Sequence, residues 1–224
     1  MINILKDYPQ PTQPRYIKKN FRSFSDKLIA NHKDERFYNG SRSTGYGGYR
    51  DDGRWKKVAL NCIQDYNLID GSNFLHVNCD YGFLLSEVKK INPNINVFGS
   101  EYSEYAYKNI NSSIKDNVKL IDPRAISFGD VKFDLIIALS VVYTFNIYDA
   151  ILFLKKLNNL SKNNKIFITL ATYNTKEEFD LFNSWTLLGN LCLKKEEWYE
   201  IFAEANYKGD YLFIDSNYLS LKFK

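Results

Sequence analysis

From Trp55 onward, apolar residues fall alternately into helical repeats and short continuous runs. Trp55, Val58, Ala59, Cys62 and Ile63 recur at helical spacing and predict a helix over residues 55–67. Further helices are expected at 83–91, 103–110, 149–160 and 194–205, and strands at 74–78, 95–99, 118–121, 133–139, 165–171, 211–214 and 218–223. The runs at 133–139 and 165–171 are almost wholly apolar, which is typical of strands covered on both faces.

This alternation of strands and helices predicts βαβ units. Such units build a doubly wound, mostly parallel α/β sheet with helices on both faces. The last two runs, 211–214 and 218–223, are expected to pair with each other as an antiparallel ending.

The first 54 residues have a different character. Early prolines and a glycine-rich stretch at 40–54 interrupt the periodicity, and only 21–29 looks like a short helix. We therefore divide the chain into an N-terminal leader, residues 1–54, and an α/β domain, residues 55–224.

Three predicted strand ends carry candidate binding residues, because ligands of open parallel sheets bind beyond the carboxyl ends of the strands. Gly82 opens the helix after the first strand, where the backbone can approach a ligand and the helix N-terminus favours a negative group. Glu101 lies 19 residues later at the next strand end, where a carboxylate can accept both hydroxyls of an adenosine ribose. Asp122, at the third strand end, can accept a hydrogen bond from an adenine amino group. Each also has a plainer interpretation: a packing glycine, a solvated carboxylate and an Asp-Pro turn.

With these residues in this order, the sequence from Trp55 to the C-terminus resembles the class I S-adenosylmethionine-dependent methyltransferases. The sequence is similar above all to a bacterial small-molecule branch of that family. The matching parts are the leader Gly45-Tyr-Gly-Gly-Tyr-Arg-Asp-Asp-Gly-Arg-Trp55, the turn Cys79 to Leu85, the segment Gly99 to Ala106 and the tail Glu197 to Tyr211. The resemblance implies a Rossmann-like, seven-stranded sheet with a final antiparallel strand, and S-adenosyl-L-methionine as cofactor.

The resemblance also assigns cofactor contacts by position. In the α/β domain it implies Asn78, Cys79 and Gly82 around the methionine part, Glu101 on the ribose, Tyr102, Asp122 and Pro123 at the adenine, and Leu139 and Ser140 beneath the cofactor. In the leader it implies that Tyr46 and Tyr49 close over the cofactor and, together with Arg54, bind its carboxylate.

The first turn departs from the family pattern at three positions. His76 stands where members usually have an acid, Asn78 replaces the first glycine and Asp80 replaces a small residue. Asparagine tolerates a left-handed backbone better than most residues, so the turn can survive. Asp80 would repel the cofactor carboxylate unless it turns outward or meets a cation such as Arg54.

Tyr143 is the candidate catalytic residue, because it follows the fourth strand where relatives often have histidine. It could orient or deprotonate the methyl acceptor, but a phenol with an ordinary pKa of ~10 is a poor base. Packing at the rim of the site is the alternative interpretation.

Charge and composition exclude several classes of protein and leave a few interpretations open. Residues 1–57 hold 13 lysines and arginines against six acidic residues, although the whole chain carries only +4, so an anionic partner is one interpretation and a solvated surface another. No apolar run reaches the ~18 residues of a membrane span, and the first ten residues lack the apolar core of a secretory signal. Three scattered cysteines and two histidines favour neither a disulfide framework nor a metal site, and a reducing, cytoplasmic setting fits them.

Three functions remain open from the sequence. The favoured one is an enzyme that methylates a small polar or anionic metabolite, such as a sugar or a nucleotide-linked intermediate. The alternative is a non-catalytic or regulatory protein of the same fold, which the residues at 76, 78 and 80 suggest. A nucleic-acid methyltransferase is disfavoured, because no Asn-Pro-Pro-Tyr signature or separate nucleic-acid-binding module is present. The methyl acceptor and the oligomeric state are left open.

Overall fold

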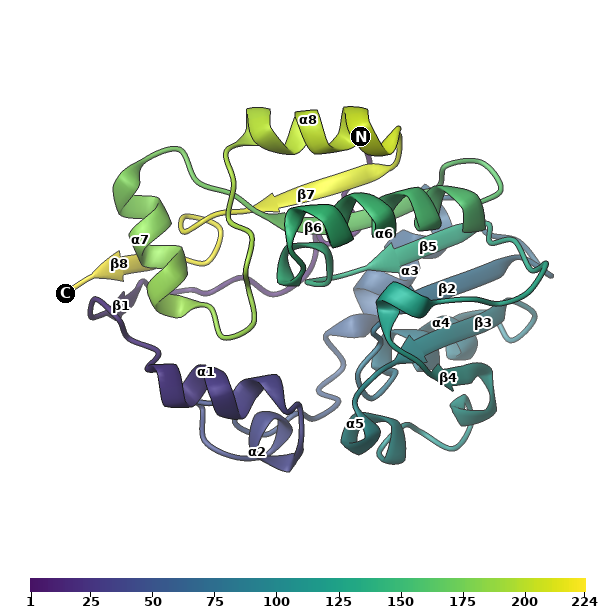
Figure 1. Cartoon of the computed structure of the whole chain (residues 1–224). Coiled ribbons are helices and arrows are strands. Elements are labelled where there is room, and N and C mark those ends of the chain that lie inside the picture. Colours follow the sequence, from purple (N-terminus) through teal and green to yellow (C-terminus); the bar gives the residue numbers. More distant parts are fainter.

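The computed structural model describes all 224 residues and is built around a six-stranded sheet in the order β4-β3-β2-β5-β6-β7 (Figure 1). All five pairings in this sheet are parallel. Its strands are β2 (Asn73–Val77), β3 (Asn96–Glu101), β4 (Val118–Leu120), β5 (Leu135–Ala138), β6 (Ile166–Ala171) and β7 (Asp210–Ile214). Two further strands, β1 (Arg15–Ile17) and β8 (Leu221–Phe223), form a separate small parallel sheet.

Helices pack on both faces of the large sheet. They are α1 (Phe24–Asn31), α2 (Glu35–Tyr38), α3 (Trp55–Asp65), α4 (Phe83–Ile91), α5 (Glu104–Lys108), α6 (Ile147–Leu160), α7 (Lys176–Trp185) and α8 (Lys195–Ala205). Alternate residues of β5 serve two separate cores: Leu135 and Ile137 join the core with α3 and α4, whereas Ile136 and Ala138 join the core with α6 and α8. The apolar runs are therefore buried on both sides, as the sequence predicts.

The predicted elements between residues 55 and 214 all have counterparts in the structure. Ser103 begins α5 as its N-cap, and its hydroxyl accepts a hydrogen bond from the Ala106 N–H at 3.0 Å. The predicted helix at 83–91 coincides with α4. Helix α7 was not predicted, although Thr175 and Glu178 form a capping box at its start.

The predicted antiparallel ending is wrong. β7 pairs in parallel with β6, and β8 leaves the large sheet to pair with β1, so that sheet has six strands rather than seven and no antiparallel member. The cause lies in residues 215–220, where the Leu219 N–H donates to the Asp215 carbonyl and the Leu221 N–H to that of Ser216. This helical turn carries the chain onward instead of reversing it as a two-residue hairpin would. Leu221 is then buried in a small apolar cluster with Ile17 and Leu181.

The leader packs in three places, one of which is the pairing of β1 with β8 described above. Ile4 and Leu5 are buried in the core around α3 and α4, and the Asn61 side chain donates to the Ile4 carbonyl at 3.0 Å. Residues 23–50, which include α1 and α2, lie by contrast across the carboxyl ends of the strands (Figure 1). The leader is thus anchored at its start and covers the candidate site farther along.

Two structural absences bear on function. No helix of this chain combines the length and the apolar character that crossing a bilayer requires. No three His, Cys, Asp or Glu side chains gather where they could hold a metal ion, and all three cysteines are free and buried.

Candidate functional site: two joined cavities at the strand ends

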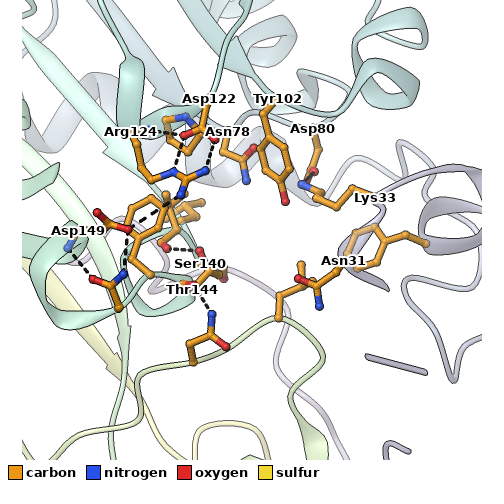
Figure 2. A pocket seen from close by; sticks show the side chains of 18 of the residues that line it. Asn31, Lys33, Asn78, Asp80, Tyr102, Asp122, Arg124, Ser140, Thr144 and Asp149 are labelled. Carbon is orange, nitrogen blue, oxygen red and sulfur yellow. Dashed lines mark hydrogen bonds and ion pairs between the residues drawn. The ribbon is translucent and has the colours of Figure 1, made fainter. Parts of the chain in front are cut away.

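A first cavity of about 440 Å³ lies at the carboxyl ends of β2 to β5, under the leader (Figure 2). Seven residues proposed as cofactor contacts line it: Tyr46, Asn78, Tyr102, Asp122, Pro123, Leu139 and Ser140. They come from the leader and from the loops after four different strands, so the fold brings together positions that are far apart in the sequence. The volume lies within the ~300–1,000 Å³ range of small-molecule sites.

The first turn keeps a glycine-like backbone although only one of its three left-handed residues is glycine. Asn78, Asp80 and Gly82 all have left-handed φ values, of 57°, 51° and 74°. Asparagine and aspartate are the non-glycine residues that adopt this conformation most readily. The divergent residues are thus compatible with a tight turn between β2 and α4.

Asp80 does meet a cation, but the cation is Lys33 rather than Arg54. The Lys33 ammonium lies 3.0 Å from Asp80 Oδ1, and the hydroxyls of Tyr38 and Tyr46 donate to the same carboxylate at 2.7 and 3.0 Å. Arg54 instead pairs with its neighbour Asp52 and donates to the Tyr8 hydroxyl at 3.3 Å. The negative charge of Asp80 is therefore balanced from within the chain.

Glu101 has no exposed surface and lines neither cavity. Its carboxylate accepts backbone N–H bonds from Asp80, Tyr102 and Ser103 at 2.8, 3.0 and 2.8 Å. The Asn78 amide, oriented so that both groups are satisfied, donates to both oxygens at 3.2 Å. In this arrangement Glu101 supports the turn from behind, and its proposed ribose contact stays a prediction that needs one oxygen to be released.

Lys33 is the centre of this set of side chains, which we call the Lys33 cluster: Lys33, Tyr38, Tyr46, Asp80 and Glu101. Its ammonium is also 3.8 Å from Glu101 Oε1 and 4.9 Å from the centre of the Tyr102 ring, and only 4% of its side chain is exposed. Burial alone would lower the pKa of Lys33, but the carboxylates, Asp80 foremost, hold that pKa above its ordinary value. The cluster thus joins the leader to the first two strand ends by a buried charge network.

The opposite wall of the first cavity carries a second, more exposed ion pair. Asp122 accepts bonds from the Arg124 backbone N–H at 2.8 Å and from its guanidinium at 2.9 and 2.7 Å (Figure 2). Hydrogen bonding from Arg124 lowers the pKa of Asp122, so this carboxylate is ionised at neutral pH. Arg124 also reaches Asp149 at 4.0 Å.

A second cavity, of about 660 Å³, meets the first at Asn78, Leu139 and Ser140. Three more residues proposed from the sequence, Tyr49, Arg54 and Tyr143, line this second cavity and not the first. The two cavities therefore adjoin where β2 and β5 end.

Tyr143 is half-buried and packs edge-on against Phe182, with 6.1 Å between the ring centres. Burial raises the pKa of its phenol above the ordinary value, and a hydrogen-bonding effect of Ser140 opposes the rise only in part. The hydroxyl therefore stays protonated at neutral pH, and it can donate a hydrogen bond to a ligand but cannot serve as a ready base.

Two proposed contacts, Cys79 and Gly82, line neither cavity. The Cys79 side chain is buried in the core near Gly99, and burial raises the pKa of its thiol. A Cβ on Gly82 would lie 2.5 Å from Ile114 Cδ1, so this glycine serves both the left-handed turn and close packing.

Replacing Gly82 by alanine is expected to destabilise the protein by about 1–3 kcal/mol more than the same change at Gly129. Both glycines have positive φ values, of 74° and 63°, so both substitutions strain the backbone. Only at Gly82 does the new methyl group clash, because Gly129 has nothing within 4 Å of an added Cβ. Urea unfolding of the two variants measures the difference, and equal losses would contradict the packing role.

Sequence reasoning missed the roles of Lys33, Tyr38 and Arg22. Lys33 and Tyr38 complete the Lys33 cluster, and Arg22 lines the second cavity. The excess of basic residues in the leader was the only sequence signal for Lys33 and Arg22, and it singles out neither. Nothing in the sequence pointed to Tyr38.

Comparisons with known proteins place the fold. No family model matches the sequence, and no curated protein is similar to it. Among solved structures, a protein from Bacillus halodurans C-125 superposes on this chain with a TM-score of 0.51 at 16% identity. That protein is described as a methyltransferase, and the superposition covers 66% of this chain and 67% of that one. The two proteins share a fold, and at this identity the likeness extends no further.

Two other similar structures have lower scores. An S-adenosylmethionine-dependent methyltransferase from Clostridium acetobutylicum ATCC 824 is 17% identical over 50% of this chain, with a TM-score of 0.42, and the match spans only 47% of that protein. Magnesium protoporphyrin IX methyltransferase from Synechocystis PCC 6803, solved with bound cofactor, is 17% identical over 61% of this chain and 72% of its own, with a TM-score of 0.43.

Proposed function

We propose that this protein is an S-adenosylmethionine-dependent methyltransferase that acts on a small polar or anionic metabolite. The observation that carries the proposal is the first cavity, which seven residues proposed by position as cofactor contacts line together. The shared fold with the Bacillus protein agrees with it.

The side chains of the first cavity suit the cofactor in two respects. Its methionine part is a zwitterion, and Lys33 and Asp80 offer one charge of each sign beside the Tyr46 hydroxyl. Its adenine is a flat base with an amino group, and Tyr102 and Pro123 offer apolar surface beside the Asp122 carboxylate. When bound, the cofactor supplies an electrophilic methyl group on its sulfonium.

The chain's own residues would then hold the acceptor and exclude water. Tyr46 lines both cavities and stacks on Tyr49, with 4.4 Å between ring centres, so the leader walls the region where the cavities meet. Ser140, fixed by its N–H bond to the Thr169 hydroxyl at 2.7 Å, lies at the same junction. Positioning of this kind supplies much of the rate of a direct displacement.

Calorimetry with S-adenosylmethionine and S-adenosylhomocysteine tests the proposal. We expect both to bind the wild-type protein, and Tyr102→Ala to weaken binding by about 1–3 kcal/mol, the range of base–aromatic stacking. Tyr148→Ala is the matched control, because Tyr148 is 69% exposed and lines neither cavity.

The outcomes separate the enzyme from the non-catalytic alternative. A wild-type protein that binds neither compound would contradict the cofactor assignment. Binding without methyl transfer from labelled cofactor to any acceptor in a low-molecular-weight cell extract would favour a regulatory protein of the same fold.

A further inference from the structure

The second cavity is unusually rich in arginine. Arg22, Arg42, Arg50 and Arg54 line it, and the only carboxylate on its wall is Asp80. Asp80 is already paired with Lys33, and Arg54 with Asp52. Arg22, Arg42 and Arg50 have no carboxylate within 4.0 Å, and Asp26 acts on Arg22 only from farther away, so no ion pair within the chain neutralises these three charges.

Arg22 is buried, unlike a typical arginine, because only 6% of its surface is exposed. One terminal nitrogen, Nη1, donates to the Arg42 carbonyl at 2.5 Å, and the guanidinium lies 5.1 Å from the centre of the Trp185 ring. Its Nε is buried without any hydrogen-bond partner. Burial, and then the nearby charge of Arg42, lower the pKa of Arg22.

A buried guanidinium with an unused donor is costly, since buried charges in proteins are nearly always paired. The planar fork of arginine matches a carboxylate or a phosphate with two parallel hydrogen bonds. An oxyanion in the cavity beside Arg22 would supply the counter-charge that this guanidinium lacks and would offset the repulsion between Arg22 and Arg42. The chain itself gives Arg22 one acceptor, the Arg42 carbonyl, but no paired carboxylate.

The second cavity has another lining residue with an unpartnered polar atom, His76. His76 is 5% exposed, lines the second cavity and leaves its Nδ1 without a hydrogen bond. Burial lowers the pKa of His76 to about 4, so the ring is neutral at neutral pH. A neutral imidazole can form one hydrogen bond with a polar group of a ligand. Much of the remaining wall is apolar and aromatic, with Tyr49, Trp55, Phe182, Trp185, Leu187 and Leu219.

We propose that the second cavity binds the methyl acceptor, and that this acceptor carries an oxyanion, either a carboxylate or a phosphate, on an aromatic or apolar body. Arg22 and Arg42 hold the oxyanion, and His76 meets another polar group of the ligand. Naming the ligand as the acceptor rests on the proposed function, whereas the anion site itself does not.

A matched set of probes tests the site: naphthoate, naphthyl phosphate and the uncharged naphthamide, titrated by calorimetry against the full chain. We expect naphthoate or naphthyl phosphate, or both, to bind more tightly than naphthamide by about tenfold or more, and less tightly as salt is added. Arg22→Gln is expected to remove about tenfold of that affinity. The stronger of the two anions indicates whether the oxyanion is a carboxylate or a phosphate.

Two further variants keep the test decisive. Arg42 is exposed, so Arg42→Gln should fold even if Arg22→Gln does not, and it is expected to weaken the same probes. Arg36→Gln is the control, because Arg36 pairs with Asp34 on the leader surface and lines neither cavity. Equal binding of naphthamide and the anions, or anion binding that Arg22→Gln and Arg42→Gln leave intact, would overturn the proposal.

The same titrations on the wild-type protein, repeated with S-adenosylmethionine, separate the two proposals. Anion binding that depends on Arg22 without any cofactor binding would refute the methyltransferase assignment and leave the anion site standing. Cofactor binding without anion binding would refute the anion site alone.

Discussion

Lys33→Met is expected to lower the free energy of unfolding by about 3–5 kcal/mol at neutral pH, the usual loss when one partner of a buried ion pair is removed. The substitution keeps an unbranched side chain of similar length but removes the ammonium. Asp80 and Glu101, respectively 3.0 and 3.8 Å from that ammonium, would then face each other without a cation. Two close, poorly solvated carboxylates repel each other strongly.

The loss should depend on pH in a defined direction. Burial raises the pKa of Glu101 above its usual value, and Lys33 opposes the rise. Without Lys33, the folded-state pKa rises further above that of the unfolded chain. Between these two values the folded protein binds more protons than the unfolded chain, so stability falls as pH increases. The deficit of Lys33→Met is thus expected to be largest near pH 7 and to narrow below about pH 4, where the carboxylate is protonated in both states.

Urea unfolding across this pH interval measures the effect. Lys19→Met is the matched control, because Lys19 is an exposed leader lysine without an ion pair, and surface changes of that kind usually stay within about 0.5 kcal/mol. A Lys33→Met protein as stable as Lys19→Met at neutral pH would show that the Lys33 cluster does not hold the leader on the domain.

The elements of the α/β domain could be predicted because their signals are local. Helix α4 has apolar residues at helical spacing and ends just before Asn92-Pro93, and β5 and β6 are continuous apolar runs between polar turns. Parallel strands with helical crossovers then bring the strand ends to one edge. For this reason Asn78, Tyr102, Asp122 and Ser140 could be expected near a common site.

The contacts that could not be predicted join distant parts of the chain. Lys33 and Asp80 are 47 residues apart, and nothing in the leader distinguishes Lys33 from Arg54 as the partner of Asp80. Structure decides between them, because Arg54 is occupied by Asp52 two residues away. Likewise β8 pairs with β1 from the other end of the chain, and a short apolar run such as Leu221–Phe223 does not encode its partner.

Glu101 shows how position can be predicted while role cannot. Its place at the end of β3 is as expected, but the backbone amides of Asp80, Tyr102 and Ser103 take its oxygens. These donors come from the turn and from the start of α5, whose detailed path is set by the packing of the whole region. A carboxylate at a strand end can thus serve the ligand or the loop that holds the ligand.

Ile4→Ala is expected to destabilise the protein by about 3–5 kcal/mol, the upper part of the range for truncating a buried aliphatic side chain. Ile4 has no exposed surface and belongs to the core that includes Val58 and Cys62 of α3. Its carbonyl is fixed by the Asn61 side chain, so the surrounding backbone has little freedom to close the cavity. The control is Leu28→Ala, because Leu28 lies on α1 with 55% of its surface exposed.

The pair of variants decides how the leader is built. If it were a loose arm that only closes over ligand, truncating either side chain would cost little. The structure instead anchors the leader at residues 4 and 5 before the chain reaches Lys33 and Tyr46. Ile4→Ala should therefore lower the cooperative unfolding midpoint in urea, while Leu28→Ala leaves it nearly unchanged. Equally small losses in both would mean that the start of the chain is detached in solution, and that the leader is held by the Lys33 cluster and by the pairing of β1 with β8.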